Sequence, residues 1–257
     1  MDSNEPTLAL SAVIICNDPA PHLARCLRSL AFCDEVLLYL NGAADDAGKL
    51  AESFDNVRAV RGEFSGFGPT KQAATELARH DWILSIDSDE SVDGSLQSAL
   101  GAVEWSATTR AYTVLRQNYF LGQHVQRGGW GNDTLLRVFN RKTAAFNDKV
   151  VHEKVVAGAD VTVTPLSGTL RHEAISSIDQ FLEKIGRYSA LAAQSEVAKP
   201  GSHPLLALLR AHFAFFRSYV LQLGFLAGWR GVVIAQGRFT GTFFRYTKRF
   251  ARQQELE

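Results

Sequence analysis

Short apolar runs that alternate with helical patterns over the first ninety residues constrain the fold of this chain more than any other feature. The runs are rich in aliphatic and β-branched residues, which predicts buried strands, and they cover residues 8–16 (LALSAVIIC), 35–40 (EVLLYL), 57–60 and 82–86 (WILSI). Helical patterns separate them at residues 22–30, 46–54 and 70–79. This alternation is typical of βαβ units around a parallel sheet. The predicted fold class is therefore α/β, with a Rossmann-like, mainly parallel central sheet.

The pattern is looser in the rest of the chain. It predicts strands at residues 111–116, 135–140 and 161–170, and a helix over residues 177–193. The segment KPGSHP (199–204) contains two prolines and a glycine, which predicts a break in regular structure. We therefore expect one domain over residues 1–198 and a helical, basic and aromatic extension over residues 199–257.

Composition fits a globular protein, and its charge is unevenly distributed. The chain has 257 residues, of which 46% are hydrophobic and 21% charged, so disorder and a small disulfide-stabilised scaffold are excluded. The 27 basic and 27 acidic residues cancel, but residues 1–196 contain 18 Lys and Arg against 25 Asp and Glu, whereas residues 197–257 contain 9 against 2. An acidic body is thus joined to a basic tail. A nucleic-acid-binding protein fits poorly, because its basic surface would lie beside an acidic body.

The basic tail has the pattern of an amphipathic helix at an anionic membrane surface. It contains no Asp or Glu between Glu196 and Glu255. Helical spacing places its aromatic residues on one face and its arginines on another: Phe239, Phe243, Tyr246 and Phe250 against Arg238, Arg245, Arg249 and Arg252. The longest uncharged run, residues 218–229, is shorter than the roughly 20 residues that span a bilayer. The alternative is that the tail packs on the acidic body of its own chain.

The N-terminus and the cysteines are typical of a cytoplasmic protein. Residues 1–7 are polar and acidic, without the pattern of a signal peptide. The three cysteines, Cys16, Cys26 and Cys33, form no CxxC motif. Their odd number and spacing favour buried thiols in a reducing compartment over a redox or metal site.

The run ILSIDSDE (83–90) is the strongest chemical signal in the sequence. It is a hydrophobic strand that ends in the carboxylates Asp87 and Asp89. In open α/β sheets ligands bind at the carboxyl ends of the strands. Two carboxylates one residue apart can reach one divalent cation, and Mg²⁺ or Mn²⁺ takes oxygen ligands while it bridges phosphates. A metal–diphosphate site is predicted here; a solvated acidic turn is the alternative.

Several segments together resemble inverting family-2 glycosyltransferases of the GT-A fold. The chain most closely resembles the branch that adds glucose to the heptose of the lipopolysaccharide inner core. The matching segments, in order, are LSAVIIC (10–16), EFSGFGPTKQAA (63–74), DWILSIDSDE (81–90), GGWGND (128–133), RVFNRKTAAFNDKVVHEKV (137–155), FLEKIGRYSALAA (181–193) and GFLAGWRGVVIA (224–235). They cover nearly the whole chain, and their order and spacing make the resemblance specific.

The resemblance implies a set of donor-binding and metal-binding residues. Asp87 and Asp89, with His152, would hold the metal on the donor diphosphate. The residues expected to contact the donor itself are Lys71, Asp87, Ser88, Trp130 and Arg137. Plainer interpretations stay open for three of these residues. Lys71 would be a solvated lysine at a helix start, Trp130 a tryptophan packed in the core, and Arg137 an arginine at a solvated strand end. Arg171 and His172 match a family position to which no role is assigned.

Inverting transfer requires a carboxylate that removes a proton from the acceptor hydroxyl as the anomeric carbon is attacked from the opposite side. Asp133, which ends the segment GGWGND, is the first candidate for this base, and Glu153 is the second. A plain loop aspartate is the alternative for Asp133.

Two departures from the family pattern fall in the expected pocket for the nucleotide base. Pro19 stands where the family has a glutamate, and Leu40 stands where it commonly has an aspartate. Asp18, Asn41 or Asp45 is expected to read the base instead. The other possibilities are a different donor nucleotide or lost activity.

The predicted function is that of a metal-dependent, inverting glycosyltransferase at the cytoplasmic face of the inner membrane. Its expected donor is a UDP-hexose, with glucose as the sugar, and its acceptor a lipid-linked glycan such as the lipopolysaccharide inner core. Mg²⁺ or Mn²⁺ is the expected cofactor. The alternatives are a GT-A transferase with a protein or another lipid-linked glycan as acceptor, and a catalytically impaired protein that binds sugar nucleotides or serves as a scaffold.

Overall fold

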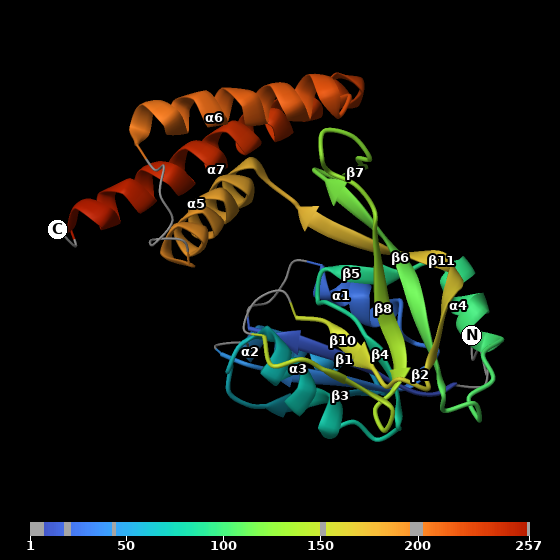
Figure 1. Cartoon of the computed structure of the whole chain (residues 1–257). Coiled ribbons are helices and arrows are strands. Elements are labelled where there is room, and N and C mark those ends of the chain that lie inside the picture. The colour runs from blue at the N-terminus through green and yellow to red at the C-terminus, as the bar shows by residue number, and fades with distance from the viewer. Residues whose placement is uncertain (1–7, 18–21, 43–44, 150–152, 196–202, 256–257) are drawn as a thin grey trace. The chain divides into compact units, whose positions relative to one another are not determined.

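The computed structural model describes residues 8–17, 22–42, 45–149, 153–195 and 203–255. The chain divides into two compact units, and Figure 1 shows the elements of each. The first unit contains the residues up to 117 together with 133–172, and the second contains 118–132 together with 173–257. The boundary expected at residues 198 and 199 lies inside the second unit, because the helix before that boundary packs with a helix after it.

Parallel strands form one side of the sheet in the first unit. β1 pairs with β2 and β4, and β3 pairs with β2, all in parallel. The helices α1, α2 and α3 each follow one of the first three strands. The bounds are β1 Leu8–Cys16, α1 Leu23–Arg28, β2 Cys33–Leu40, α2 Asp45–Ala51, β3 Val57–Arg61, α3 Phe67–Glu76 and β4 Trp82–Ser85. The predicted α/β class and its βαβ alternation are confirmed.

Antiparallel strands continue the sheet beyond β4. β8 runs antiparallel to both β4 and β6, and β5 pairs antiparallel with β11. The strand order is β3-β2-β1-β4-β8-β6-β11-β5, with β7 beside β6 and a separate β9-β10 hairpin. The bounds are β5 Glu90–Val92, β6 Arg110–Phe120, β7 Gln123–His124, β8 Asp133–Asn140, β9 Ala144–Phe146, β10 Val155–Ala157 and β11 Thr162–Ile175. The sheet is thus parallel on one side of β4 and contains antiparallel pairs on the other.

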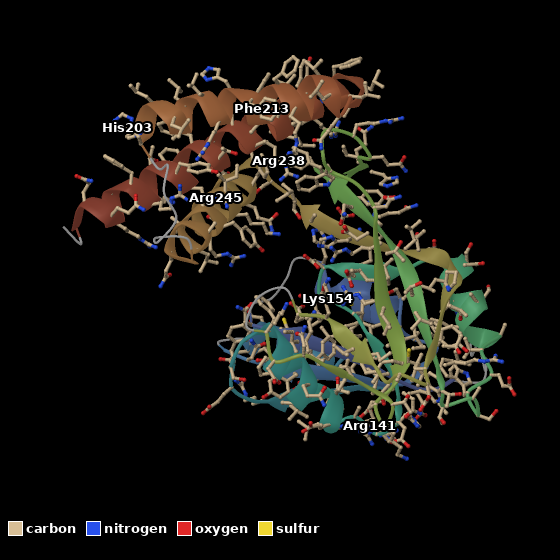
Figure 2. The ribbon with its side chains drawn as sticks, viewed as in Figure 1. Arg141, Lys154, His203, Phe213, Arg238 and Arg245 are labelled. Atoms are coloured by element: carbon tan, nitrogen blue, oxygen red, sulfur yellow. The ribbon has the colours of Figure 1, made fainter. Side chains whose placement is uncertain are left out.

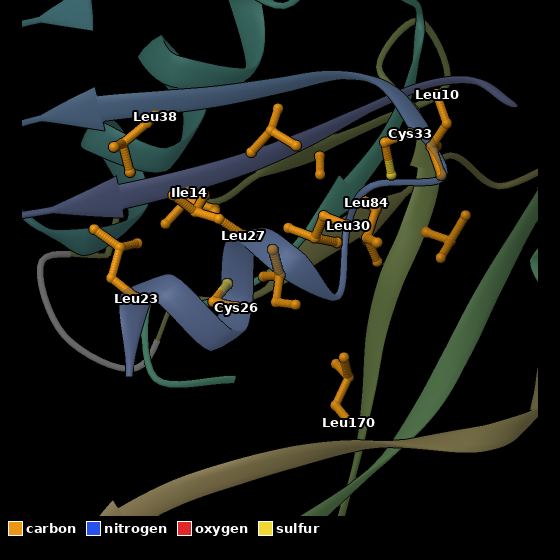
Figure 3. Close-up of a cluster of buried hydrophobic side chains, with 14 of the residues drawn as sticks. Leu10, Ile14, Leu23, Cys26, Leu27, Leu30, Cys33, Leu38, Leu84 and Leu170 are labelled. Atoms are coloured by element: carbon orange, nitrogen blue, oxygen red, sulfur yellow. The ribbon is translucent and has the colours of Figure 1, made fainter. Parts of the chain in front are cut away.

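The main core of the first unit lies between α1 and the parallel strands. Figure 3 shows Leu23 and Leu27 of α1 beside Ile14 of β1, and all three side chains are fully or almost fully buried. Cys16, Cys26 and Cys33 are buried and none of them forms a disulfide, as predicted. Burial raises the pKa of the Cys33 thiol and so keeps it neutral.

The second unit is mainly helical. α5 (Ile178–Ser195) and α6 (Pro204–Phe216) both pack on the long α7 (Gly228–Glu255). A π-helical turn, η1 (Arg217–Leu221), and a 3-10 turn, η2 (Gly224–Ala227), connect α6 to α7. Among the described residues no single helix meets the length and hydropathy needed to cross a membrane; Pro204–Leu221 and Gly224–Gln254 meet them only as a pair, bent by 70°.

The aromatic stripe of α7 is covered by α6, which corrects the expectation that this stripe faces a membrane. Phe239 packs edge-on against His212, with ring centroids 5.0 Å apart, and Phe250 packs against His203 at 5.6 Å. The Arg210 guanidinium lies 4.4 Å from the Tyr246 ring centroid. Helical spacing predicted that these aromatic side chains share a face, but it could not show that a second helix of the same tail covers that face.

A different surface of the second unit exposes apolar side chains. The exposed face, as we call it, consists of twelve large hydrophobic residues on α6, η1, η2 and the start of α7: Leu205, Leu208, Leu209, Phe213, Phe216, Val220, Leu221, Leu223, Phe225, Leu226, Trp229 and Val232. Leu205 and Leu209 are 69% and 68% exposed. Phe213, labelled in Figure 2, lies on the same α6 stripe.

Candidate functional site

The candidate site lies at the carboxyl ends of β1 and β4 in the first unit. β1 leads by way of α1 to β2 on one side, whereas β4 pairs on the other side of β1. Such a reversal of strand order leaves a crevice where α/β sheets bind ligands. Asp87 follows β4 at this point, so the fold places the DSDE segment where the sequence predicted it.

Asp87 is the centre of a buried cluster of charges. Its Oδ1 accepts a hydrogen bond of 2.7 Å from Lys71 Nζ, and its Oδ2 accepts one of 2.8 Å from Arg137. Burial alone would raise the pKa of Asp87, but the charges of Arg137 and Lys71 outweigh it and hold the pKa well below its usual range. Asp87 is therefore ionised, and each of its oxygens is bonded to a fixed cation.

Lys71 brings together residues far apart in the sequence. It lies on α3, and its Nζ also donates to Glu153 Oε1 at 2.8 Å. Burial would lower the pKa of Lys71, but Asp87 and Glu153 outweigh it and raise the pKa. A side chain at Gly68 would collide with the carbonyl of Asn147, so this glycine lets the 147–149 segment lie against the start of α3. The lysine is a buried cation between two carboxylates and not a solvated helix-start residue.

Glu90 and Arg116 extend the cluster toward Asp133. Arg137 donates to Glu90 Oε1 at 2.9 Å, and Arg116 donates to the same oxygen at 3.3 Å. Arg116 also donates to Asp133 Oδ2 at 2.8 Å, across the pairing of β6 with β8. Burial raises the pKa of Glu90 despite the nearby Arg137, with Asp87 adding to the rise. The first candidate base, Asp133, is thus linked through Arg116 to the charge cluster.

Asp89 differs from Asp87 in its partners. Its side chain is 29% exposed and, among the described residues, has one ion-pair contact, Oδ2 to His172 Nε2 at 3.4 Å. Ser88 and Asp89 form the turn between Asp87 and β5. Among the described residues, no three His, Cys, Asp or Glu side chains are grouped so that they could hold a metal ion. His152 lies outside the described residues.

The surroundings of Asp87 and Asp89 fit a divalent cation that is held by one of the two carboxylates. Both oxygens of Asp87 are bonded to cations, and a divalent ion there would be repelled by Lys71 and Arg137. The Asp89 carboxylate is 29% exposed, so an oxygen-seeking ion can approach it. Mg²⁺ in particular is commonly held by one or two carboxylates together with substrate phosphates. Asp89 is therefore the described residue that fits the expected cofactor, and Asp87 is not.

The three candidates for reading the nucleotide base have different surroundings. Asn41 follows β2 and is buried, and its side-chain Oδ1 has no hydrogen-bond partner among the described residues. Asp45 is 72% exposed and ion-paired with Arg61. Asp18 lies outside the described residues. Buried polar atoms without hydrogen-bond partners are rare. A bound ligand would therefore supply the hydrogen-bond donor that Asn41 Oδ1 lacks.

Trp130 lies in the second unit, in an aromatic cluster. Its ring packs edge-on against Phe120 at 5.2 Å and lies 6.4 Å from Phe181. The glycines before it, Gly128 and Gly129, have positive φ and form the turn that leads into it. Its expected contact with the donor sugar stays a prediction.

Three members of the cluster were not assigned a role from the sequence: Glu90, Arg116 and His172. Glu90 stands in the DSDE segment, which was its one visible signal. His172 pairs with Glu90 in the β11–β5 register, and this antiparallel contact brings it to Asp89. Arg116 lies on a strand with no motif around it. Long-range strand pairing brings Arg116 and His172 into the cluster, and local sequence patterns do not show such pairing.

Comparisons with known proteins show what the chain is similar to. No protein-family model matches the chain. Several of its relatives among known proteins are glycosyltransferases. The chain is 27% identical over 244 residues to the lipopolysaccharide core biosynthesis glycosyltransferase LpsC of Rhizobium meliloti, with 90% of each chain covered. It is 25% identical over 262 residues to an uncharacterized glycosyltransferase of Rickettsia bellii, covering 94% of this chain and 86% of the relative.

Solved structures were also compared. S. aureus TarS aligns with a TM-score of 0.45 and 14% identity over 85% of this chain and 45% of TarS. TarS 1–349 in complex with UDP-GlcNAc aligns with a TM-score of 0.44 and 10% identity, covering 95% of this chain and 92% of the other. The sequence relatives confirm the resemblance to glycosyltransferases of the lipopolysaccharide core branch.

Proposed function

We propose that this protein is a glycosyltransferase of the GT-A type that moves a hexose from a UDP-sugar to a lipid-linked glycan of the lipopolysaccharide core. The observation that most supports this is the convergence of Lys71, Asp87, Arg137 and Glu153 at the carboxyl ends of β1 and β4. The similarity to LpsC over nine tenths of both chains supports the acceptor class. Glucose is the hexose we propose, from the sequence resemblance alone.

The charge of the cluster supports a divalent cation in the donor complex. Five carboxylates, those of Asp87, Asp89, Glu90, Asp133 and Glu153, surround three fixed cations, those of Lys71, Arg116 and Arg137. A nucleotide diphosphate would add further negative charge. Mg²⁺ or Mn²⁺ held by Asp89 and by the phosphates would offset this charge and stabilise the departing nucleotide.

Asp87 then has a positioning role. It holds Lys71 and Arg137 in place by one hydrogen bond from each. Fixed cations near the developing charge of a leaving diphosphate stabilise the transition state without reorganisation of the site. Lys71 and Arg137 would supply this stabilisation, and Ser88 lies in the turn that follows Asp87.

Asp133 is the base we propose for inverting transfer. Its side chain is 46% exposed, so an acceptor hydroxyl can approach it, and its contact with Arg116 orients it. Glu153 is less exposed, and it shares the Lys71 ammonium with Asp87. A carboxylate that already compensates a buried lysine is a poorer base, because protonation would leave that lysine with one partner fewer.

Asn41 is the residue we propose to read the base. Its unpartnered Oδ1 can accept a hydrogen bond from the N–H of a pyrimidine ring, as the missing aspartate would. Asp45 is a weaker candidate, because its carboxylate is solvent-exposed and already paired with Arg61.

We further propose that the second unit binds the cytoplasmic face of the inner membrane. The exposed face of α6, η1 and η2 supports this proposal, since its apolar side chains can enter the interfacial layer of a bilayer. The absence of Asp and Glu from residues 197–254 adds attraction to anionic lipid. The nucleotide-sugar site would thereby be held near a lipid-linked acceptor.

Calorimetric titration with UDP-, GDP-, CDP- and dTDP-hexoses, with and without Mn²⁺, tests the proposed donor. We expect the UDP-hexose to bind more tightly than the others, and Mn²⁺ to strengthen that binding. Asp89→Asn should lose the effect of Mn²⁺, whereas Asp46→Asn, a change of equal charge at an exposed residue of α2, should keep it. Failure of every nucleotide sugar to bind would refute the proposed function.

A further inference from the structure

Two phenylalanines are exposed on the edge of the sheet that carries the candidate site. Phe64 is 50% exposed and Phe67 is 42% exposed. Phe64 lies in the loop that follows β3, and Phe67 is the first residue of α3. Loops at the carboxyl ends of parallel strands line the ligand crevice of an open α/β sheet. The aromatic pair, as we call these two residues, is therefore on the ligand side of the first unit.

The two rings of the aromatic pair pack against each other. Their centroids are 5.2 Å apart and their planes are inclined by 81°, which is an edge-to-face contact. In such a contact the edge of one ring meets a face of the other, so the first ring keeps both of its faces clear of its partner. The pair thus offers a flat apolar surface to a planar ligand.

Backbone contacts hold the loop of the aromatic pair beside the carboxyl end of β2. The Gly62 amide donates to the Leu40 carbonyl at 3.0 Å. The Tyr39 hydroxyl donates to the Glu63 carbonyl at 3.4 Å. A side chain at Gly62 would collide with the Tyr39 ring, so glycine permits this close approach. Phe64 follows Gly62 by two residues, which span at most about 7 Å, so the pair begins next to the end of β2.

The side chain of Asn41 lies on the face of the sheet that α3 covers. Tyr39 packs in the hydrophobic cluster that contains Ala74 of α3, whereas Leu40 packs in the cluster of α1. The Asn41 amide continues the strand pairing, because it donates to the Cys16 carbonyl at 2.9 Å. Successive side chains of a strand point to opposite faces, so Asn41 shares the face of Tyr39. Its buried Oδ1, which lacks a partner among the described residues, is therefore on the same face and edge as the aromatic pair.

α3 also relates the aromatic pair to the charge cluster. Phe67 and Lys71 are four residues apart on this helix, so their side chains share one face. Lys71 Nζ reaches Asp87 at 2.7 Å, and Phe67 lies one turn nearer to the start of the helix, at the ligand edge. A nucleotide with its diphosphate at Lys71 would thus have its nucleoside directed along the ligand edge, where the aromatic pair lies.

We propose that the aromatic pair stacks on the nucleobase of the donor while Asn41 Oδ1 accepts a hydrogen bond from the ring N–H of that base. This inference rests on the proposed function, because it takes the donor to be a nucleotide. A pyrimidine has two flat faces and a polar edge, so it satisfies the exposed rings and the buried oxygen together. A phosphate group alone satisfies neither. Stacking supplies affinity for any base, and Asn41 supplies the selection among bases.

Calorimetric titration of the full chain with UDP, CDP and inorganic pyrophosphate, each with Mn²⁺, tests the proposal. The double variant Phe64→Ala, Phe67→Ala should weaken UDP binding at least about fivefold, which corresponds to about 1 kcal/mol, the lower end for one base–aromatic stack. CDP binding should weaken by the same factor, because every base has a flat π-face. Pyrophosphate binding should be unchanged, because pyrophosphate has no base.

Two matched variants serve as controls. Phe64→Tyr with Phe67→Tyr keeps both aromatic faces and should retain UDP binding. Leu77→Ala removes an apolar side chain of similar exposure, 47%, just after the other end of α3, and should leave the binding of all three ligands unchanged.

Unchanged UDP affinity of the double alanine variant would overturn the proposal. An equal loss of UDP and pyrophosphate affinity would also overturn it, since the aromatic pair would then support the chain around Lys71 without contacting a base. Loss of vesicle binding or of transfer to the acceptor, with UDP affinity retained, would assign the pair to another partner and overturn it as well. Failure of the wild type to bind UDP would refute the proposed function and this inference together, whereas UDP binding that ignores the aromatic pair refutes this inference alone.

Discussion

Asp87 and Asp89 belong to one DSD motif, yet we propose different roles for them, and substitution of each to asparagine tests this difference. Asp87 compensates two buried cations, Lys71 and Arg137. Among the described residues, the one ion-pair contact of Asp89 is with the partly buried His172. If Asp87 holds the cation cluster together, its loss must lower the stability of the metal-free protein. If both residues are simply metal ligands, neither substitution should lower the stability of the metal-free protein.

The expected magnitudes follow from the contacts. Removal of one partner from a buried ion pair costs about 3 to 5 kcal/mol. Lys71 keeps Glu153 and Arg137 keeps Glu90, so the cost of Asp87→Asn should fall at the lower end, about 3 kcal/mol. The partly exposed Asp89–His172 pair is worth about 0 to 1 kcal/mol. The two variants should therefore differ by about 2 kcal/mol or more.

Urea unfolding in the presence of EDTA measures this difference. The signal should come from the first unit, because the chain has two units and a single transition for the whole chain is not assured. Hydrogen exchange of the β1 and β4 amides provides such a signal. Asp46→Asn serves as the exposed control. Equal unfolding free energies for Asp87→Asn and Asp89→Asn would refute the positioning role of Asp87.

Three further predictions concern the base pocket, acid stability and the exposed face. Asn41→Leu should weaken UDP binding about tenfold, as measured by calorimetry, because it removes one hydrogen bond of about 1.5 kcal/mol. Asn41→Asp keeps an acceptor oxygen and should retain UDP binding. Burial would raise the pKa of Glu35, but its hydrogen bonds and the Arg58 guanidinium lower this pKa below 4.5. The contribution of Glu35 to stability is therefore present above pH 4.5 and is lost as the pH falls further. The Glu35→Gln variant should lose less unfolding free energy than the wild type between pH 5 and pH 3. Leu209→Asn with Phe213→Asn should reduce sedimentation with anionic vesicles without loss of UDP binding, and unchanged sedimentation would contradict the membrane role of this face.

The sequence predicted most elements of the first unit because their patterns are local. The run at residues 8–16 coincides with β1, and the alternation that follows gives the order of α1, β2, α2 and β3. β5, α4 (Gly94–Gly101) and the β9-β10 hairpin were not predicted. α4 has a local signal, since the Asp93 carboxylate caps it by accepting from the Leu96 amide. β5 and the hairpin are three residues per strand, too short for a periodic pattern.

The site was predicted where a motif stood beside a strand, and missed where strand pairing created it. Asp87 and Lys71 were both expected to contact the donor and lie together in the structure, although their mutual ion pair is a contact that the sequence did not show. Arg116 and His172 enter the cluster through β6 and β11, whose neighbours in the sheet are distant in sequence. The tail shows the same limit, because the aromatic face of α7 was visible in the sequence and its cover, α6, was not.

The proposed transfer is assayed by release of UDP from a UDP-hexose, measured with and without a lipopolysaccharide inner-core acceptor in the presence of Mn²⁺. We expect acceptor-stimulated release by the wild type and by Asp46→Asn. We also expect a loss of at least about 100-fold in kcat for Asp133→Asn, the lower end of what a general base contributes, with UDP-hexose binding retained. Absence of UDP release by the wild type under these conditions, or full activity of Asp133→Asn, would contradict the proposed transfer.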